Sequence, residues 1–501
     1  MARGSVSLRS SEESERTPTI GEPTEKSATN PRAAGGRAAQ ELARPRVLIV
    51  SRSAAHLSYF ESIITGLEAR GADVELLFDE EWSKSWSTGR KSRLDELRQE
   101  RPDLKIGWSV RRADRWREGL FALRELRSYR SYLTRVETTK FYVDRWRSYL
   151  IPAVAKRIEK PFWKALLKTG AADFAMRAAE RLAPCDPLVR DLLERRNPDF
   201  LIVTPANMRF SEETDYLKAA RNLGIPTALP VLSWDNLSTK GLIQIAPDMV
   251  FVWNAAQHDD AVQLHKIPPK RLTIAGAPFF DKWFDGSPDA ADRDSFCERI
   301  GLDAERKILL YLGSSANIAR DESWFVEAVA KRLAASADPH LAGTQIVVRP
   351  HPANAKIYAR LEEKGIRVWP QDGALPETRE QFAEMRETFR HADAALGVNT
   401  SGMVDAVLAD RPVFTVRIPR YADTQTNSRH FRQMTAARAL YLTEDISGFC
   451  EGLSAIFAGK DPLAARRRAF AEAFARPCGR ARPAGDVIAE AIISRVRDRH
   501  G

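Results

Sequence analysis

The chain contains little cysteine. Among its 501 residues there are only 4 Cys, namely Cys185, Cys297, Cys450 and Cys478. They form no Cys-x-x-Cys pair, and none has a histidine beside it in the sequence. This pattern predicts neither a zinc site nor a disulfide framework, and it favours a reducing compartment. We therefore expect a cytoplasmic protein.

Long apolar runs are also absent. The longest ones, such as Met249–Trp253 and Ile308–Leu312, fall far short of the roughly 18 apolar residues that a membrane-spanning helix needs. The N-terminus, from Met1 to about Thr29, is rich in Ser, Glu and Thr and lacks the apolar core of a secretory signal. We expect no membrane span, and a disordered tail over residues 1–45.

What is present is an ordinary globular composition of considerable length. Hydrophobic residues make up 44% of the chain, and 77 Lys and Arg against 67 Asp and Glu give a formal charge of +10. A single core seldom grows beyond roughly 250–300 residues. The length therefore predicts at least two domains.

Two series of apolar segments of strand length alternate with helical patterns. The first comprises Arg46–Ser51, Ala72–Phe78, Pro198–Pro205, Pro226–Ser233, Asp248–Asn254 and Lys270–Pro278. The second comprises Lys307–Ser315, Thr344–Pro352, Gly365–Pro370, Ala392–Gly402 and Arg411–Ile418. Continuous apolar strands indicate parallel sheets that are buried on both faces. We predict an α/β fold of two doubly wound, Rossmann-like domains at 46–285 and 300–470, joined by a linker at Phe284–Arg293.

An insertion over about 82–181 shows mostly helical patterns and no convincing strand. It is rich in basic residues interleaved with aromatic ones between 111 and 147. Such charges most often form a solvated helix face whose aromatic residues pack on the protein. The alternative is a basic, aromatic surface for an anionic membrane. No nucleic-acid partner is expected, because no recognised binding motif accompanies the charge.

Loops after the strands carry the candidate site, because ligands of such sheets bind beyond the carboxyl ends of the strands. In the run Asn399, Thr400, Ser401 and Gly402, a strand ends where a helix should begin, which suits a phosphate; the alternative is simple helix capping. Asp405 lies one helical turn further on, where it could bind ribose hydroxyls.

Two further loops of the second domain fit the same phosphate. Ser314 and Ser315 follow its first strand, where a Gly-Ser-Ser turn can approach a phosphate closely or merely cap the next helix. Arg349 and His351 follow the second strand in a Pro-stiffened loop, and arginine is suited to clamp phosphate.

Other candidates follow strands elsewhere. His56 lies in the first loop of the first domain, and an imidazole can take a proton from an attacking hydroxyl near neutral pH. For this residue and the next set, loop hydrogen bonding and helix capping are the competing explanations. The remaining candidates are Trp234, Asp235, Asn236, Tyr421, Asp423, Gln425 and His430.

Several of these motifs resemble nucleotide-sugar-dependent glycosyltransferases of the GT-B fold. The opening strand with its His-bearing loop, the segment NTSGMVDAVLADRPVF and the loop RYADTQTN carry the likeness, and VRPHP resembles a motif of capsule and teichoic-acid polymer transferases and of UDP-N-acetylglucosamine 2-epimerases. The resemblance implies a base role for His56, diphosphate contacts for Ser401 and Gly402, a ribose contact for Asp405, and closing helices at 471–501 that cross back to the first domain. The donor-site histidine of many such enzymes is missing, and His351 could replace it.

Together these features predict metal-independent transfer of a sugar from a nucleotide-diphosphate donor, with no cofactor. The acceptor would be a cell-envelope glycan or a lipid-linked molecule, with His56, or failing it Asp235, as the base and with Trp234, Asn236, Asp423, Gln425 and His430 as sugar or acceptor contacts. Three alternatives stay open. They are a nucleotide-sugar 2-epimerase, a polyol-phosphate (glycerophosphate) transferase, and a non-catalytic binding module at the inner face of the plasma membrane.

Overall fold

The computed structural model describes residues 44–86, 93–286, 291–373, 376 and 378–500. The predicted tail therefore lies outside the described residues except for its last two positions. Parts of the predicted linker and insertion also fall outside them.

The first sheet has seven parallel strands in the order β3-β2-β1-β4-β5-β6-β7. Its strands are β1 (Arg46–Ser51), β2 (Asp73–Phe78), β3 (Lys105–Trp108), β4 (Phe200–Thr204), β5 (Thr227–Pro230), β6 (Met249–Val252) and β7 (Leu272–Ile274). The helices of this half are α1 (Glu61–Glu68), α2 (Glu80–Trp86), α3 (Arg93–Glu100), α4 (Arg117–Thr134), α5 (Lys140–Arg147), α6 (Pro152–Ile158), α7 (Pro161–Lys168), α8 (Gly170–Leu182), α9 (Pro187–Arg196), α10 (Glu213–Asn222), α11 (Asn236–Thr239) and α12 (Ala255–His265).

The second sheet has six parallel strands in the order β10-β9-β8-β11-β12-β13. Its strands are β8 (Ile308–Leu312), β9 (Gln345–Arg349), β10 (Arg367–Val368), β11 (Ala394–Gly397), β12 (Val413–Val416) and β13 (Tyr441–Thr443). The helices are α13 (Arg293–Ile300), α14 (Ser323–Ala334), α15 (Arg379–His391), α16 (Gly402–Leu408), α17 (Phe431–Ala436), α18 (Ile446–Phe457), α19 (Ala464–Ala475) and α20 (Ala484–His500). Short 3₁₀ helices are η1 (Ala54–Tyr59), η2 (Pro269–Arg271), η3 (Pro278–Trp283), η4 (Pro352–Lys364) and η5 (Pro419–Tyr421).

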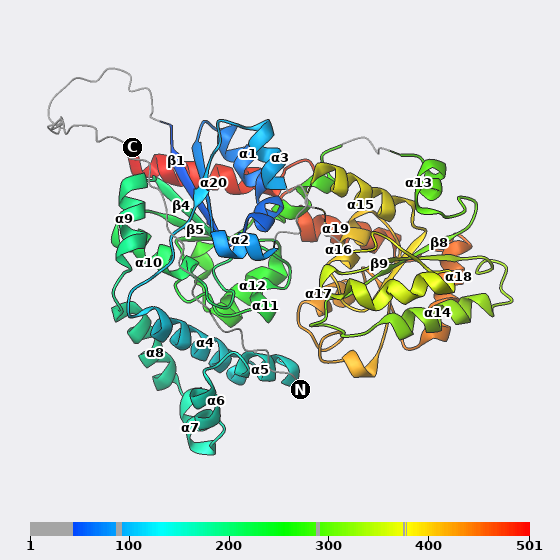
Figure 1. Cartoon of the computed structure of the whole chain (residues 1–501), viewed down its shortest axis with the longest axis horizontal. Coiled ribbons are helices and arrows are strands. Elements are labelled where there is room, and N and C mark those ends of the chain that lie inside the picture. The colour runs from blue at the N-terminus through cyan, green and yellow to red at the C-terminus, as the bar shows by residue number, and fades with distance from the viewer. Residues whose placement is uncertain (1–43, 87–92, 287–290, 374–375, 377, 501) are drawn as a thin grey trace, which may run out of the picture. The chain divides into compact units, whose positions relative to one another are not determined.

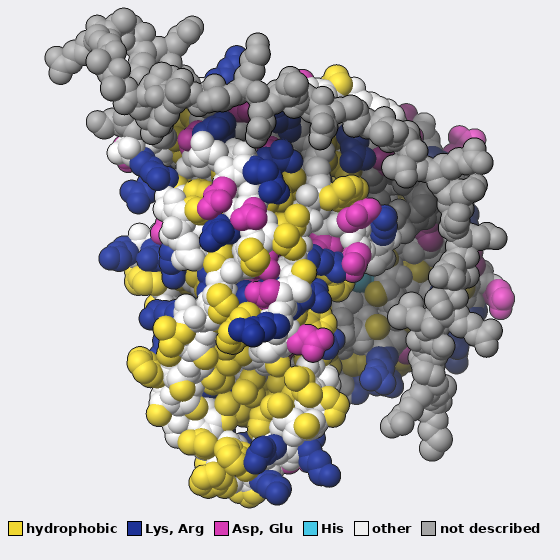
Figure 2. Space-filling model, turned by 60° about the vertical axis from the view of Figure 1, so that its left-hand side comes forward, with side chains coloured by type: hydrophobic (Ala, Val, Ile, Leu, Met, Phe, Trp, Pro, Cys, Tyr) yellow, Lys and Arg dark blue, Asp and Glu magenta, His cyan; other side chains and the backbone are white. Residues whose placement is uncertain are grey.

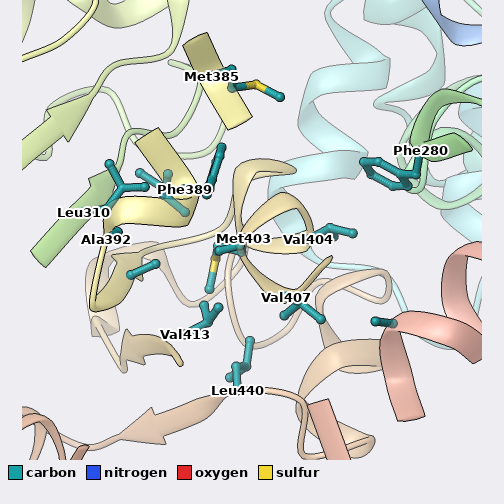
Figure 3. Packing of buried hydrophobic residues seen from close by; sticks show 14 of the residues in the cluster. Phe280, Leu310, Met385, Phe389, Ala392, Met403, Val404, Val407, Val413 and Leu440 are labelled. Carbon is teal, nitrogen blue, oxygen red and sulfur yellow. The ribbon is translucent and has the colours of Figure 1, made fainter. Parts of the chain in front are cut away.

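Helices cover both faces of each sheet (Figure 1), which explains the unbroken apolar strands. In β1, Val47 and Ile49 enter one hydrophobic cluster while Leu48 and Val50 enter another on the opposite face. In β8 the alternate residues also divide between two clusters, one of which is shown with Leu310, Met403 and Val407 in Figure 3. The predicted doubly wound α/β fold is therefore confirmed.

The last helix, α20, completes the core of the first sheet. Its residues Ile488 and Ile492 pack in the same cluster as Ile63 of α1. The two helices approach so closely that a Cβ on Gly485 would come within 2.3 Å of the Ser62 carbonyl carbon. The carboxylate of Asp281 fixes the start of α20 by accepting hydrogen bonds of 2.9 Å from the backbone N–H groups of residues 484 and 485.

Two short strands differ from the sequence-based expectation. The insertion contains β3, although no strand was expected there, and it pairs with β2 in parallel. At the end of the second sheet, β13 was also not expected. Both are edge strands of three or four residues with partly exposed side chains, so they lack the continuous apolar run that marks the central strands.

Two arginines of the insertion bind other residues of the protein. Arg112 and Arg124 are buried and both contact Asp215 of α10, with nitrogen-to-oxygen distances of 2.8–3.0 Å. Arg124 also binds Glu180 of α8 at 3.0 Å. For these two buried arginines, the predictions of a solvated helix face and of a membrane surface are both wrong. Their ion pairs connect α4 and α8 to α10 of the first sheet domain.

Candidate functional site

The loops at the carboxyl ends of the two sheets contact each other. Trp283, in the segment that joins the sheets, donates a 2.9 Å hydrogen bond from Nε1 to Asp405 of α16. Trp234, after β5, places its ring edge-on to that of His430 at 4.8 Å between centroids. Asp405 and His430 of the second half therefore lie beside residues of the first half and of the connecting segment.

Arg349 presents a free positive charge at the end of β9. Its half-buried guanidinium makes no hydrogen bond or ion pair with any residue that the structure describes. Burial lowers its pKa to about 10, against the opposing effect of Asp405 and two other carboxylates. The group stays charged at neutral pH and is available to bind an anion.

Asp405 lies under the influence of two cations, Lys282 and Arg349. Burial raises the pKa of Asp405 to about 6, although the Trp283 hydrogen bond, Lys282 and Arg349 all favour its ionised form. Burial lowers the pKa of Lys282 to about 8, although Asp405 opposes this. The lysine ammonium lies 4.2 Å and 4.0 Å from the ring centroids of Phe279 and Phe382. Lys282 thus adds a second cation to the anion site.

His351 caps η4 with its imidazole. Its Nδ1 accepts a 3.1 Å hydrogen bond from the backbone N–H of Ala353, and burial lowers its pKa. The neutral ring therefore carries its proton on Nε2, which can donate to a ligand oxygen.

The small polar residues of the predicted phosphate loops divide into two groups. Ser314 and Asn399 are buried and bonded to each other, since the Asn399 backbone N–H donates to the Ser314 hydroxyl at 3.4 Å. They hold the ends of β8 and β11 together. Ser315 and Thr400 are partly exposed, Ser401 is exposed with no capping hydrogen bond from its side chain, and Gly402 starts α16. The second group is the one that a ligand can reach.

His56 lies in η1, directly after β1. Its Nδ1 is buried and has no hydrogen-bond partner among the described residues, so no carboxylate there orients the ring. Burial, assisted by the positive charge of Arg52, lowers the pKa of His56 to about 4. The imidazole is therefore neutral at physiological pH, as a general base must be.

Tyr59 lies next to His56 and between the two halves of the site. Its ring stacks on Phe279 at 4.3 Å, and the two rings of Tyr59 and His56 meet edge to face at 6.2 Å. Burial and the negative charges of Asp405 and Asp235 raise the pKa of Tyr59 to about 12. The hydroxyl stays protonated and can serve as a hydrogen-bond donor.

Asp235 is already fully bonded. Its carboxylate accepts hydrogen bonds of 2.7 Å from both Ser233 and Thr239 and pairs with Lys240 at 3.3 Å. Burial alone would raise its pKa, but Lys240, His430 and the two hydroxyls outweigh it and hold the pKa below its ordinary value. The carboxylate is therefore a weak base whose oxygens are already bonded, whereas the Nδ1 of His56 has no partner among the described residues.

The remaining predicted contacts are mostly used inside the protein. Gln425 is fully buried, with its amide oxygen bonded to the N–H of Ile418 and its nitrogen to oxygens of β12 and residue 398. Asn236 is paired with Asn207 at 2.6 Å. Trp234 packs in a hydrophobic cluster, whereas Asp423 is exposed. For Gln425 and Asn236, the loop-bonding explanation accounts for the side chains.

His430 is buried between the two halves. Its Nε2 lies 3.1 Å from the Asn399 side-chain nitrogen, while its Nδ1 has no partner among the described residues. Burial lowers its pKa to about 4, which Asp235 opposes. The ring is neutral, with Nδ1 left to donate toward a ligand.

Three residues of this region were missed from the sequence: Tyr59, Lys282 and Tyr142. Tyr142 comes from α5 of the insertion, and its buried hydroxyl has no partner among the described residues; burial and then Asp235 raise its pKa. For Lys282, the sequence offered Phe279 three positions earlier, whose ring the ammonium contacts, as a signal.

No cluster of three or more His, Cys, Asp or Glu that could hold a metal ion occurs among the described residues. Within the same part of the chain, no helix is both long and apolar enough to cross a bilayer.

Comparison with known proteins places this architecture in a structural class. No protein-family model and no curated protein matches the chain. Among solved structures, UDP-GlcNAc 2-epimerase from Neisseria meningitidis bound to UDP-GlcNAc matches with a TM-score of 0.51 and 12% identity over 90% of this chain and 100% of that one. UDP-GlcNAc 2-epimerase from Methanocaldococcus jannaschii matches with a TM-score of 0.51 and 12% identity over 90% and 99% of the two chains. The wall teichoic acid polymerase TagF has a TM-score of 0.47 and 9% identity over 90% and 89%. The chain thus has the GT-B fold, which confirms the predicted resemblance at the level of fold.

Proposed function

We propose that this protein is a GT-B transferase that moves a sugar from a nucleotide-diphosphate donor to a hydroxyl of a cell-envelope glycan or lipid-linked acceptor, without a metal ion. The single observation that carries the proposal is the Arg349 guanidinium, which makes no ion pair with a described residue at the end of β9 and, like Lys282, acts on the charge of Asp405. Fixed positive groups stabilise the negative charge that develops on a departing diphosphate.

The reaction assigns one role to each half of the site. His56 takes the proton from the acceptor hydroxyl, whose oxygen forms the new bond to the anomeric carbon. The bond from that carbon to the diphosphate breaks, and the nucleoside diphosphate leaves with the electron pair. Arg349, Lys282 and the Nε2–H of His351 receive its charge.

Nucleotide binding tests the donor site. We expect UDP or another nucleoside diphosphate to raise the melting temperature of the wild-type protein, because a ligand that binds only the folded state stabilises it. Arg349→Ala should weaken that binding roughly 10- to 100-fold, the usual worth of a charged hydrogen bond. It should leave the unliganded melting temperature unchanged, since Arg349 binds no described residue.

The control is Arg332→Ala, which removes an exposed arginine from α14. It should respond to nucleotide like the wild type. If no nucleotide stabilises the wild-type protein, or if Arg349→Ala binds it normally, the donor site is wrongly assigned.

The affinity for a nucleotide sugar should depend on pH. The diphosphate of UDP-GlcNAc keeps its negative charges, whereas Asp405 becomes neutral as the pH falls through about 6 and Lys282 loses its charge as the pH rises through about 8. The affinity should therefore fall as the pH rises through about 6 and again as it rises through about 8, by roughly tenfold overall. The variant Asp405→Asn retains a hydrogen-bond acceptor for Trp283. Titration calorimetry of this variant should no longer show the change in affinity near pH 6. An unchanged step would show that another group titrates.

A 2-epimerase is the second candidate, because the two 2-epimerase structures named above match with TM-scores of 0.51 and one of them is bound to UDP-GlcNAc. NMR of the protein with UDP-GlcNAc alone distinguishes the two: conversion to a C2 epimer without an acceptor supports the epimerase. The insertion favours a transferase, since it adds Tyr142 to the side of Asp235, where an acceptor would bind. A glycerophosphate transferase would instead respond to a CDP-linked donor, and a binding module would bind nucleotide without turnover.

A further inference from the structure

Helices α6, α7 and α8 of the insertion expose large apolar side chains on their outer side. Each helix already buries an inner face, because Ile158, Leu167 and Met176 pack in the cluster that holds α4 and α5. The outer positions of a surface helix are ordinarily polar. Here the exposed set is Ile151, Phe162, Leu166, Phe174 and Leu182, of which both phenylalanines are 69% exposed.

Exposed hydrophobic side chains gather on this part of the surface. Figure 2 shows hydrophobic side chains gathered over the lower part of this face, where α6–α8 lie in Figure 1, with Lys and Arg side chains at the lower end. Singly exposed apolar residues are normal, whereas a gathered patch marks an interaction site.

Most basic residues of α6 and α7 form no ion pair with a described residue. Five of them lie on or between α6 and α7 and make no ion pair with any residue of the described ranges: Lys156, Arg157, Lys160, Lys164 and Lys168. The one acidic residue between Pro152 and Lys168, Glu159, is paired with Arg147. The rim is therefore strongly positive, unlike Arg124 of α4, whose charge is paired inside the protein.

A groove lined by both apolar and charged side chains adjoins the patch. It has a volume of about 700 Å³, and its apolar wall includes Phe121, Tyr149, Ile151 and Phe210. The guanidinium of Arg209 lies over the rings of Tyr149 and Phe210, at 4.7 Å and 4.2 Å from their centroids, and has no ion pair among the described residues. Ile151 belongs to both the groove and the patch.

We propose that the surface of α6–α8 docks on an anionic lipid bilayer, with Phe162, Leu166 and Phe174 entering the interface and the five basic residues binding lipid headgroups. Apolar side chains surrounded by unpaired cations match a surface that is negatively charged outside and apolar beneath. A protein partner would not need so many unpaired charges. Docking would bring the enzyme to a lipid-linked acceptor, and only this biological role rests on the proposed function. The test of docking needs no nucleotide.

Co-sedimentation of the full chain with vesicles tests the docking. We expect binding to phosphatidylcholine vesicles that contain phosphatidylglycerol and little binding to phosphatidylcholine alone. Lys156→Gln, Lys160→Gln and Lys164→Gln together should lower the partition coefficient by about 100-fold, at roughly fivefold for each charge. Phe162→Ser with Leu166→Ser should lower it at least tenfold. All of these side chains are exposed, so the variants should fold normally.

Matched controls change the same chemistry elsewhere. Lys331→Gln with Lys356→Gln and Lys460→Gln removes three exposed lysines from the second half, and Leu188→Ser removes an exposed leucine from α9. Both should bind vesicles like the wild type. Equal binding to both kinds of vesicle, equal loss in the controls, or a dimer in light scattering that Phe162→Ser dissociates without any vesicle binding would each overturn the proposal. Nucleotide binding, measured separately, should be unaffected in every variant.

Discussion

We expect His56→Ala to slow sugar transfer by about 10²- to 10⁴-fold, the usual contribution of a general base. The imidazole follows the first strand directly and stays neutral because burial lowers its pKa to about 4. Nucleotide affinity should not change, since the phosphate contacts are assigned to the other half. The measurement is the steady-state transfer rate alongside nucleotide binding by calorimetry.

The pH profile gives a second readout for the same residue. An unshifted histidine would lose activity below about pH 6.5, whereas His56 should keep the rate constant down to about pH 5. His340→Ala, which removes an exposed histidine, is the matched control. Normal transfer by His56→Ala would pass the role of base to another group and contradict the assignment.

The second large effect concerns stability. Asp215→Asn should cost about 3–5 kcal/mol of unfolding free energy, because it leaves the guanidinium groups of Arg112 and Arg124 buried without their counter-charge. Burial alone would raise the pKa of Asp215, but Arg124 and Arg112 hold it below its ordinary value. This stabilisation is therefore complete above the ordinary range of a carboxyl and is lost as acid protonates the group.

Urea unfolding at neutral and acidic pH measures this effect. Asp144→Asn, at an exposed position of α5, should change the stability by less than about 0.5 kcal/mol. Hydrogen exchange should show that the Asp215→Asn variant opens first between α4 and α8. A variant as stable as the wild type would mean that the buried charges are solvated.

The central strands could be predicted from the sequence because both faces of each sheet are covered. A run such as Arg46–Ser51 has no polar alternation, and its alternate residues enter two separate clusters. The edge strands β3 and β13 escaped prediction for the opposite reason, since an exposed edge needs no apolar run.

The site was only partly predictable. Arg349 could be found because its position after a strand fixes where its side chain emerges. Lys282 could not, since its pKa depends on a carboxylate more than a hundred residues away in sequence. Gln425 was predicted to contact a ligand because the sequence does not show its hydrogen-bond partners. The fold brings these partners, at residues 398 and 415, to its side chain. Polar loop residues in a sequence do not show whether their bonds are already made.

The place of α20 has a consequence for how the protein is made. Helix α20 packs against α1, far from it in the sequence, and fills part of the first hydrophobic core. While the ribosome is still adding the second half, the first half lacks this helix and exposes the apolar surface that it will cover. Folding in order of synthesis, the usual route for multidomain chains, therefore cannot finish the first domain. Synthesis of α20 becomes the step that completes this core, so a chain that lacks α20 would be a target for chaperones and proteases.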